Sequence, residues 1–209
     1  MSAISAIEMP SIRYAPVKRA IDILVALVGL ILISPTLLLI ALAIRIESPG
    51  PVVYAAERTG LHGRRFRMLK FRTMVRNAEE LKAELRHLSI VPWPDFKLID
   101  DPRITRLGKF LRKTSLDELP QLWNVLVGDM SLVGPRPTSF AVDTYDLWHT
   151  ARLEVRPGIT GYWQVKGRNS ATFDERLRMD LAYIRDMSFF TDVKVVTSTF
   201  ASVMKRDGA

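Results

Sequence analysis

The sequence predicts a mostly helical α+β protein, and three observations carry that prediction. An uncharged run of 22 residues, 23–44, is long enough for a membrane-buried helix. Two short segments of strand-forming residues, 52–54 and 66–71, flank a turn that contains glycine. Near the C-terminus, residues 173–188 and 189–203 place apolar side chains at helical spacing. The chain therefore combines a membrane segment with a small domain of helices and short strands.

The composition is that of a folded, basic protein without thiol chemistry. Of the 209 residues, 48% are hydrophobic and 25% are charged, which is enough apolar material for a core. The absence of cysteine excludes disulfides, thiolate-zinc sites and cysteine nucleophiles, and the three histidines lack the HExxH spacing of a zinc protease. The net charge of +8 indicates anionic partners: phosphate ligands, an anionic membrane leaflet or nucleic acid.

The apolar run admits three interpretations from the residues alone. It is longer than the roughly 7–15 residues of a signal-peptide core, which disfavours a cleaved leader. A straight helix of this length measures roughly 33 Å and could span the bilayer. Ser34-Pro35 lies midway, where proline removes a backbone hydrogen bond, so a helix-break-helix that enters and leaves on one side is the third interpretation.

Basic residues flank the apolar run on both sides, and this favours the re-entrant interpretation. Lys18 and Arg19 precede the run, Arg45 follows it, and seven more basic residues occur between 58 and 76 with no acid among them. Both ends are thus expected on the positive side of the membrane. We expect residues 1–17 to be a lead-in, 18–46 the membrane segment and 47–209 the remaining domain.

Turn residues divide the middle of the chain into short elements. Residues 75–88 and 116–127 have the spacing of amphipathic helices, and Ser115 with Glu118 matches a capping box at the start of the second. Gly134 to Pro137 is expected to form a rigid loop before a helix over 138–153. The two C-terminal helices carry basic residues on their other faces, so they either pack on a core or lie in the membrane interface.

The adjacent carboxylates Asp117 and Glu118 are the strongest candidates for chemistry. Adjacent acids are common on solvated helix faces, but this pair follows a basic run that includes Arg112 and precedes the Pro135-Arg136-Pro137 loop. A carboxylate nucleophile, a second carboxylate for Mg²⁺ and an arginine clamp are the groups that phosphoryl transfer requires. No dinucleotide-binding glycine motif and no Walker lysine is present.

Several motifs, in order along the chain, resemble those of the bacterial sugar transferase family, the monotopic polyprenyl-phosphate phosphoglycosyl transferases. The central motifs are TSLDELPQLWNVL at 114–126 and GDMSLVGPRP at 128–137. The others are KRAID at 18–22, Ser34-Pro35, KFRTM at 70–74, VRPGITG at 155–161 and QVKGRN at 164–169. The resemblance extends from about residue 18 to the C-terminus.

The resemblance implies an activity and a location. Members of the family transfer a sugar 1-phosphate from a UDP-sugar to a polyprenyl phosphate, usually undecaprenyl phosphate, and release UMP. They require Mg²⁺, form a covalent phosphosugar-aspartate intermediate and initiate a cell-surface glycan. The membrane segment is a re-entrant helix, so the catalytic domain is expected on the cytoplasmic face of the bacterial inner membrane, among its lipids. The resemblance is also compatible with a homodimer.

The resemblance also implies residue roles. Asp117 becomes the nucleophile and Glu118 the Mg²⁺ ligand. Arg112 and Arg136 are expected to hold phosphates, with Pro135 and Pro137 shaping the loop near the nucleotide. The family motif also places Lys70 and Arg72 near the site, and Asp180 occupies a recurrent family position of unassigned role.

One alternative belongs to a different functional class. A membrane-anchored basic module could use the same charges to bind anionic lipid or nucleic acid. It would have no need of Asp117 and Glu118 beside an arginine loop, and the basic stretch holds too few aromatics for base stacking. We therefore expect no nucleic-acid partner. The sugar and the glycan pathway are not encoded in any recognisable residue.

Overall fold

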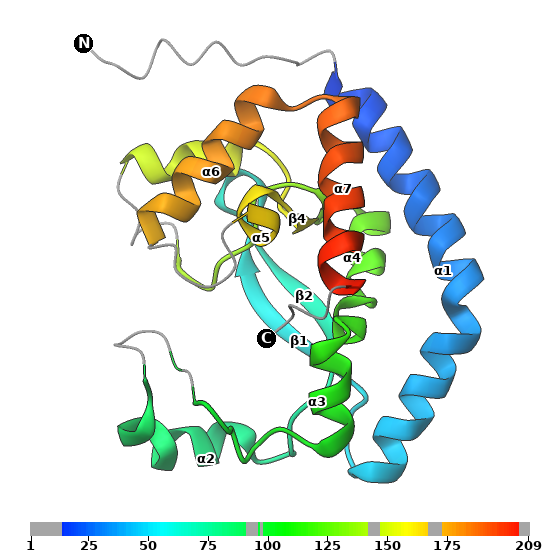
Figure 1. Ribbon diagram of the computed structural model, residues 1–209, viewed down its shortest axis with the longest axis vertical. Coiled ribbons are helices and arrows are strands. Elements are labelled where there is room, and N and C mark those ends of the chain that lie inside the picture. Colours follow the sequence, from blue (N-terminus) through cyan, green and yellow to red (C-terminus); the bar gives the residue numbers. More distant parts are fainter. Residues whose placement is uncertain (1–13, 91–95, 97, 142–146, 167–172, 205–209) are drawn as a thin grey trace.

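The computed structural model describes residues 14–90, 96, 98–141, 147–166 and 173–204 (Figure 1). One long curved helix, α1, runs along one side, and the other labelled helices and strands lie on its concave side. A β-hairpin lies in the middle of the molecule, and the described residues form two small two-stranded sheets among helices. The predicted α+β, mostly helical class is confirmed.

Helix α1 spans Tyr14–Glu47 and continues through Pro35, so the predicted interruption at this point is wrong. Proline has no N–H to donate to the carbonyl of Ile31, but the Ser34 hydroxyl donates to that carbonyl at 2.8 Å. The freed acceptor is satisfied, which is the physical reason that the helix continues through this point. Residues 1–13, most of the predicted lead-in, lie outside the described residues.

The β-hairpin pairs β1 (Val53–Thr59) with β2 (Arg65–Phe71) in antiparallel register. The two predicted strands are confirmed, but β1 continues five residues beyond the predicted end at Tyr54, as far as Thr59 opposite Arg65. The turn contains a short 3-10 helix, η2 (Leu61–Gly63), in which His62 has a φ of 52°. The hairpin buries Ala56 and Met68 against helix residues from elsewhere in the chain.

The middle of the chain forms short helices where longer ones were expected. Helix α2 (Ala78–Glu84) passes into η3 (Leu85–Leu88), and α3 (Arg106–Lys113) follows. The predicted helix over 116–127 is split into η4 (Leu116–Glu118) and α4 (Gln121–Val127). Gly128 ends α4 with a φ of 100°, a left-handed conformation that favours glycine, as the sequence predicts.

A second sheet, absent from the sequence prediction, pairs β3 (Ser131–Val133) with β4 (Gly158–Thr160) in parallel. A Cβ at Gly158 would come within 2.1 Å of the Gly134 nitrogen, so the two backbones approach as closely as glycine allows. The predicted helix over 138–153 is wrong: the described part of this segment contains only η6 (Leu147–Glu154), a 3-10 helix. Helix α5 (Tyr162–Lys166) follows β4.

The two C-terminal helices, α6 (Phe173–Asp186) and α7 (Phe189–Met204), confirm the predicted amphipathic segments. Tyr183, Ile184 and Val195 pack with Val133 in one buried cluster. The packing interpretation therefore applies to α6. Helix α7 also packs, but it leaves a row of apolar side chains exposed: Phe189, Phe190, Val193 and Phe200.

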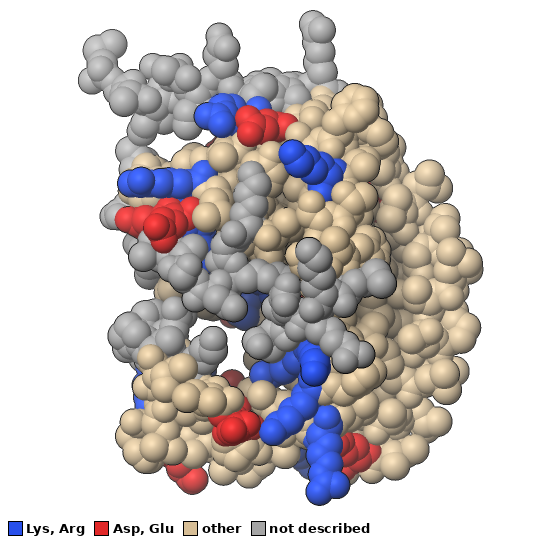
Figure 2. All heavy atoms as spheres, in the orientation of Figure 1, with Lys and Arg blue, Asp and Glu red and all other residues tan. Residues whose placement is uncertain are grey.

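Both ends of α1 are attached to the same globular part. Near the N-terminal end, Asp22 Oδ1 accepts from the backbone nitrogen of Leu132 at 3.1 Å, and Arg19 donates to carbonyls at the end of α4. Near the other end, Glu47 Oε1 accepts from the backbone nitrogen of Leu107 at 3.0 Å. Between these attachments the outer face of α1 is apolar and exposed, and Figure 2 shows the α1 side as an uncharged surface.

Candidate active site

The two predicted catalytic carboxylates lie in η4, a single turn between α3 and α4. Ser115 before it has a φ of 57° and no side-chain bond to the helix, so the predicted capping box of Ser115 and Glu118 is wrong. Glu118 extends instead to side chains from distant parts of the chain. The structure thereby brings the acidic pair against the hairpin and the Pro-Arg-Pro loop.

Glu118 is held by two cations. Its Oε1 lies 2.8 Å from Lys70 Nζ of β2 and 2.6 Å from Arg136 Nη2, and Arg136 Nη1 lies 3.4 Å from Oε2. Burial alone would raise the pKa of Glu118, but the charges and hydrogen bonds of Arg136 and Lys70 outweigh it and hold the pKa at about 2. Glu118 is therefore ionised at neutral pH.

Asp117 is more deeply buried than its neighbour, with only 8% of its surface exposed. Burial is the largest influence and raises the pKa of Asp117, while Lys70, Arg112 and Arg136 oppose that rise. The predicted residues Asp117, Lys70, Arg112 and Arg136 thus share one electrostatic environment.

Arg112 lies in the last turn of α3, where its Nε donates to Thr73 Oγ1 at 2.8 Å. Burial lowers its pKa, and the Asp117 carboxylate opposes that effect. Arg72 lies elsewhere: it donates to the carbonyl of Ser48 and packs against Gly50, in the turn after α1. The contacts of Arg72 are thus at the end of α1 and not at Glu118.

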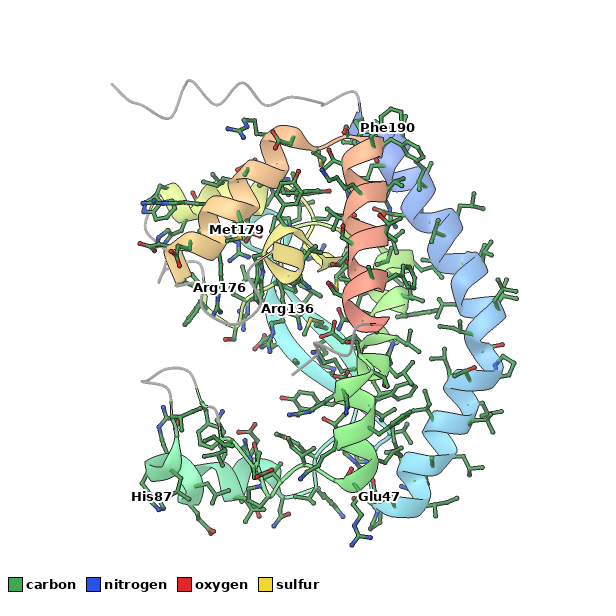
Figure 3. All side chains as sticks on the ribbon, viewed as in Figure 1. Glu47, His87, Arg136, Arg176, Met179 and Phe190 are labelled. Carbon is green, nitrogen blue, oxygen red and sulfur yellow. The ribbon has the colours of Figure 1, made fainter. Side chains whose placement is uncertain are left out.

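The loop that carries Arg136 is anchored on both sides. Gly134 donates to the Thr160 carbonyl and Gly158 donates to the Pro135 carbonyl, each at 2.9 Å. Figure 3 shows Arg136 close to the hairpin, within the curve of α1. The loop borders a recess whose lining includes Gly60, Pro135, Arg136, Pro137 and Thr138. The main chain of the loop is therefore rigid, while the Arg136 side chain extends to Glu118.

A buried ion pair behind this loop was not predicted. Arg152 Nη2 donates to the Arg136 carbonyl at 2.5 Å and lies 2.6 Å from Asp180 Oδ2. Asp180 is 1% exposed, and its burial raises its pKa to about 7 while Arg152 opposes the rise. The recurrent family position of Asp180 thus has a structural explanation: Asp180 holds the arginine that supports the Arg136 loop.

Two further residues near the site were also missed. Tyr54 pairs with Lys70 across the hairpin, and Arg58 lies four residues further along β1, on the same face. Arg136 and Arg65 lie close enough to Arg58 to add to the lowering of its pKa, of which burial is the largest cause. Side chains alternate along a strand, so Arg58 is expected on the same face of the hairpin as Tyr54 and its partner Lys70. This alternation could have identified Arg58 from the sequence.

The described residues contain no cluster of three or more His, Cys, Asp or Glu side chains that could hold a metal by themselves. Asp117 and Glu118 provide hard oxygen ligands, and Mg²⁺ sites commonly combine one or two carboxylates with substrate phosphates and water. The donor set therefore fits Mg²⁺ only when a phosphate ligand completes it.

Sequence comparisons show which known proteins this chain is similar to. The undecaprenyl-phosphate galactose phosphotransferase of Salmonella typhimurium is 43% identical over 197 residues, which are 92% of this chain and 41% of that protein. The UDP-glucose:undecaprenyl-phosphate glucose-1-phosphate transferase of Escherichia coli is 41% identical over 196 residues, 87% of this chain and 39% of that protein. This chain thus spans less than half the length of either.

Other relatives are closer in size. The exopolysaccharide production protein ExoY of Rhizobium meliloti is 40% identical over 197 residues, which are 92% of this chain and 87% of that protein. The bacterial sugar transferase family matches residues 13–206, which include α1, the hairpin, both carboxylates and the C-terminal helices. The chain therefore belongs to the bacterial sugar transferase family.

Proposed function

We propose that the protein transfers a sugar 1-phosphate from a UDP-sugar to undecaprenyl phosphate and thereby initiates a cell-surface glycan. The observation that carries the proposal is the buried Asp117 beside the cluster of Lys70, Glu118 and Arg136. The names of the Salmonella and E. coli relatives describe this class of reaction. A binding module for anionic lipid or nucleic acid would give the buried Asp117 no role.

The reaction is proposed to proceed in two displacements at one phosphorus atom. An oxygen of Asp117 attacks the β-phosphorus of the UDP-sugar, the anhydride bond breaks, and UMP leaves with the bonding electrons. A phosphate oxygen of the lipid then attacks the same phosphorus, and the Asp117 oxygen leaves with its electron pair. The carboxylate is restored, and the site need not bind both bulky substrates at once.

The cations around Asp117 support this chemistry. Arg136 on its anchored loop, Arg112 on α3 and Lys70 on β2 can each neutralise charge on the phosphate oxygens as the leaving bond breaks. Glu118 would hold Mg²⁺ together with the diphosphate. Bound there, the metal would add a fixed positive charge on the diphosphate and the departing UMP.

We also propose that α1 is re-entrant and that the domain lies on the cytoplasmic face. The attachments at Asp22 and Glu47 put both ends of α1 on one globular part, and a spanning helix would place its ends on opposite sides of the membrane. Other helices also expose large apolar side chains: Phe190 on α7, Trp123 on α4 and Phe110 on α3. Such a surface is suited to the lipid interface, where water-soluble and lipid substrates meet.

The topology is testable with a single cysteine because the chain has none. We expect Ser5→Cys, before α1, to resist a membrane-impermeant maleimide in intact cells and to react after permeabilisation. Asp100→Cys, at an exposed position of the globular part, is the matched reference and should behave identically. Labelling of residue 5 alone in intact cells would show that α1 spans the membrane.

The activity is testable by mass spectrometry on the full chain in detergent. A panel of UDP-sugars is incubated with the protein and Mg²⁺ but without lipid acceptor. We expect one UDP-sugar of the panel to react with the protein and release UMP. The intact protein should then gain the mass of one phosphosugar, and peptide mapping should place this adduct on Asp117. Undecaprenyl phosphate should then discharge the adduct. Lipid-dependent UMP release without any adduct would contradict the two-step mechanism.

A further inference from the structure

Glu118 is already fully engaged in the structure. Lys70 and Arg136 both approach its Oε1 within 2.8 Å, Arg136 also reaches Oε2, and only 19% of its side chain is exposed. A buried carboxylate needs such partners, because an unpaired buried charge is costly. The same carboxylate is the proposed ligand of Mg²⁺.

These two roles exclude one another in a single arrangement. Mg²⁺ binds carboxylate oxygens at about 2.1 Å and demands near-octahedral geometry. An ammonium and a guanidinium already occupy the space in front of Oε1, and both would repel a divalent cation at that distance. Glu118 can therefore accept a metal only if Lys70 and Arg136 withdraw.

We infer that Lys70 and Arg136 are exchangeable counter-ions of Glu118: they neutralise it in the free protein and transfer to the diphosphate when a metal–nucleotide complex binds. This inference rests on the proposed function for the identity of the ligand. Its consequence is an order of binding, in which Glu118 takes up metal together with a nucleoside diphosphate and not before it.

The balance of charge favours such an exchange. In the free site one carboxylate faces two cations. An incoming Mg²⁺ and a diphosphate group carry opposite charges of about equal size, so the total charge of the site hardly changes. Afterwards Glu118 faces the metal, and the two side chains face phosphate oxygens. Every charge keeps an opposite neighbour, and no step leaves a buried charge unpaired.

The surrounding structure allows both side chains to move while their backbones stay. Arg136 extends from a loop held by the Arg152 bond and by the backbone bonds of Gly134 and Pro135. Lys70 extends from the paired strand β2 on a flexible four-carbon stem. The exchange therefore needs rotamer changes at two side chains and no rearrangement of the fold.

The test measures Mn²⁺ binding to the full chain in detergent, by the EPR signal of free Mn²⁺, without nucleotide, sugar or lipid. We expect weak binding by the wild type and binding tighter by at least about tenfold in Lys70→Met, because one of the two cations that compete for Glu118 Oε1 is gone. Arg136→Met should shift the affinity in the same direction, so the test does not depend on one variant. Adding Glu118→Gln to Lys70→Met should abolish the gain.

Lys109→Met is the matched control, because Lys109 lies on the exposed face of α3 against Asp100. Its Mn²⁺ affinity should equal that of the wild type. Nucleotide-free Mn²⁺ affinities that are unchanged or weaker in both Lys70→Met and Arg136→Met would overturn the inference. Since no turnover is measured, this outcome is distinct from a failure of UMP release, which would instead overturn the proposed function.

Discussion

Asp117→Asn is expected to reduce lipid-dependent UMP release by at least about 10³-fold, the largest effect of any substitution at the site. Asparagine keeps the shape of the side chain but cannot form the phosphosugar bond. Glu118 is the one other acid among the groups that shift the pKa of Asp117, and the remaining groups are the cations Lys70, Arg112 and Arg136. The phosphosugar adduct should disappear together with the activity.

Asp100→Asn is the control for this experiment, since Asp100 is an exposed acid near α3 and its side chain is 90% exposed. It should retain wild-type UMP release. Near wild-type activity of Asp117→Asn, with unchanged folding, would refute the assignment of the nucleophile.

Arg152→Met is expected to lower the free energy of unfolding by about 3–5 kcal/mol, because it leaves the buried Asp180 without its counter-charge. The Arg136 carbonyl loses its donor at the same time. Chemical denaturation followed by tryptophan fluorescence measures the loss. The double variant Arg152→Met/Asp180→Asn should recover most of it, since no unpaired charge remains.

The loss of stability in Arg152→Met is expected to depend on pH. Burial already raises the pKa of Asp180 to about 7, and removing Arg152 takes away the influence that opposes the rise. A folded-state pKa above the unfolded value means that protonation favours folding. The deficit of Arg152→Met should therefore be larger at pH 8 than at pH 5.5. A deficit that does not change with pH would show that Asp180 is not the source of the instability.

The sequence correctly predicted the strands and helices whose residues follow a regular local pattern. The hairpin strands and the two C-terminal helices follow from alternation and from apolar spacing, and both are present. The capping box failed because Glu118 is recruited by Lys70 and Arg136, partners that lie far away in the chain. The parallel pair β3 and β4 was missed because three-residue strands carry no periodicity.

The candidate site shows the same division. The carboxylate pair and the Arg136 loop could be found because their residue types suit phosphoryl transfer and their motifs are specific. The ion pair of Arg152 with Asp180 could not, since only the fold brings η6 and α6 together. The predicted interruption at Pro35 was wrong because a proline removes a backbone N–H donor, and the sequence argument did not consider that the Ser34 hydroxyl could donate in its place.

The two attachments of α1 also fix the length of its apolar segment. Each inserted residue would rotate one end of a helix relative to the other by about 100° and advance it by about 1.5 Å. Asp22 and Glu47 would then no longer face Leu132 and Leu107 together. Substitutions on the outward apolar face leave the relative rotation of the two helix ends unchanged, whereas single insertions and deletions change it. The two attachments therefore restrict the number of residues between Asp22 and Glu47 more strictly than they restrict the apolar side chains on the outer face.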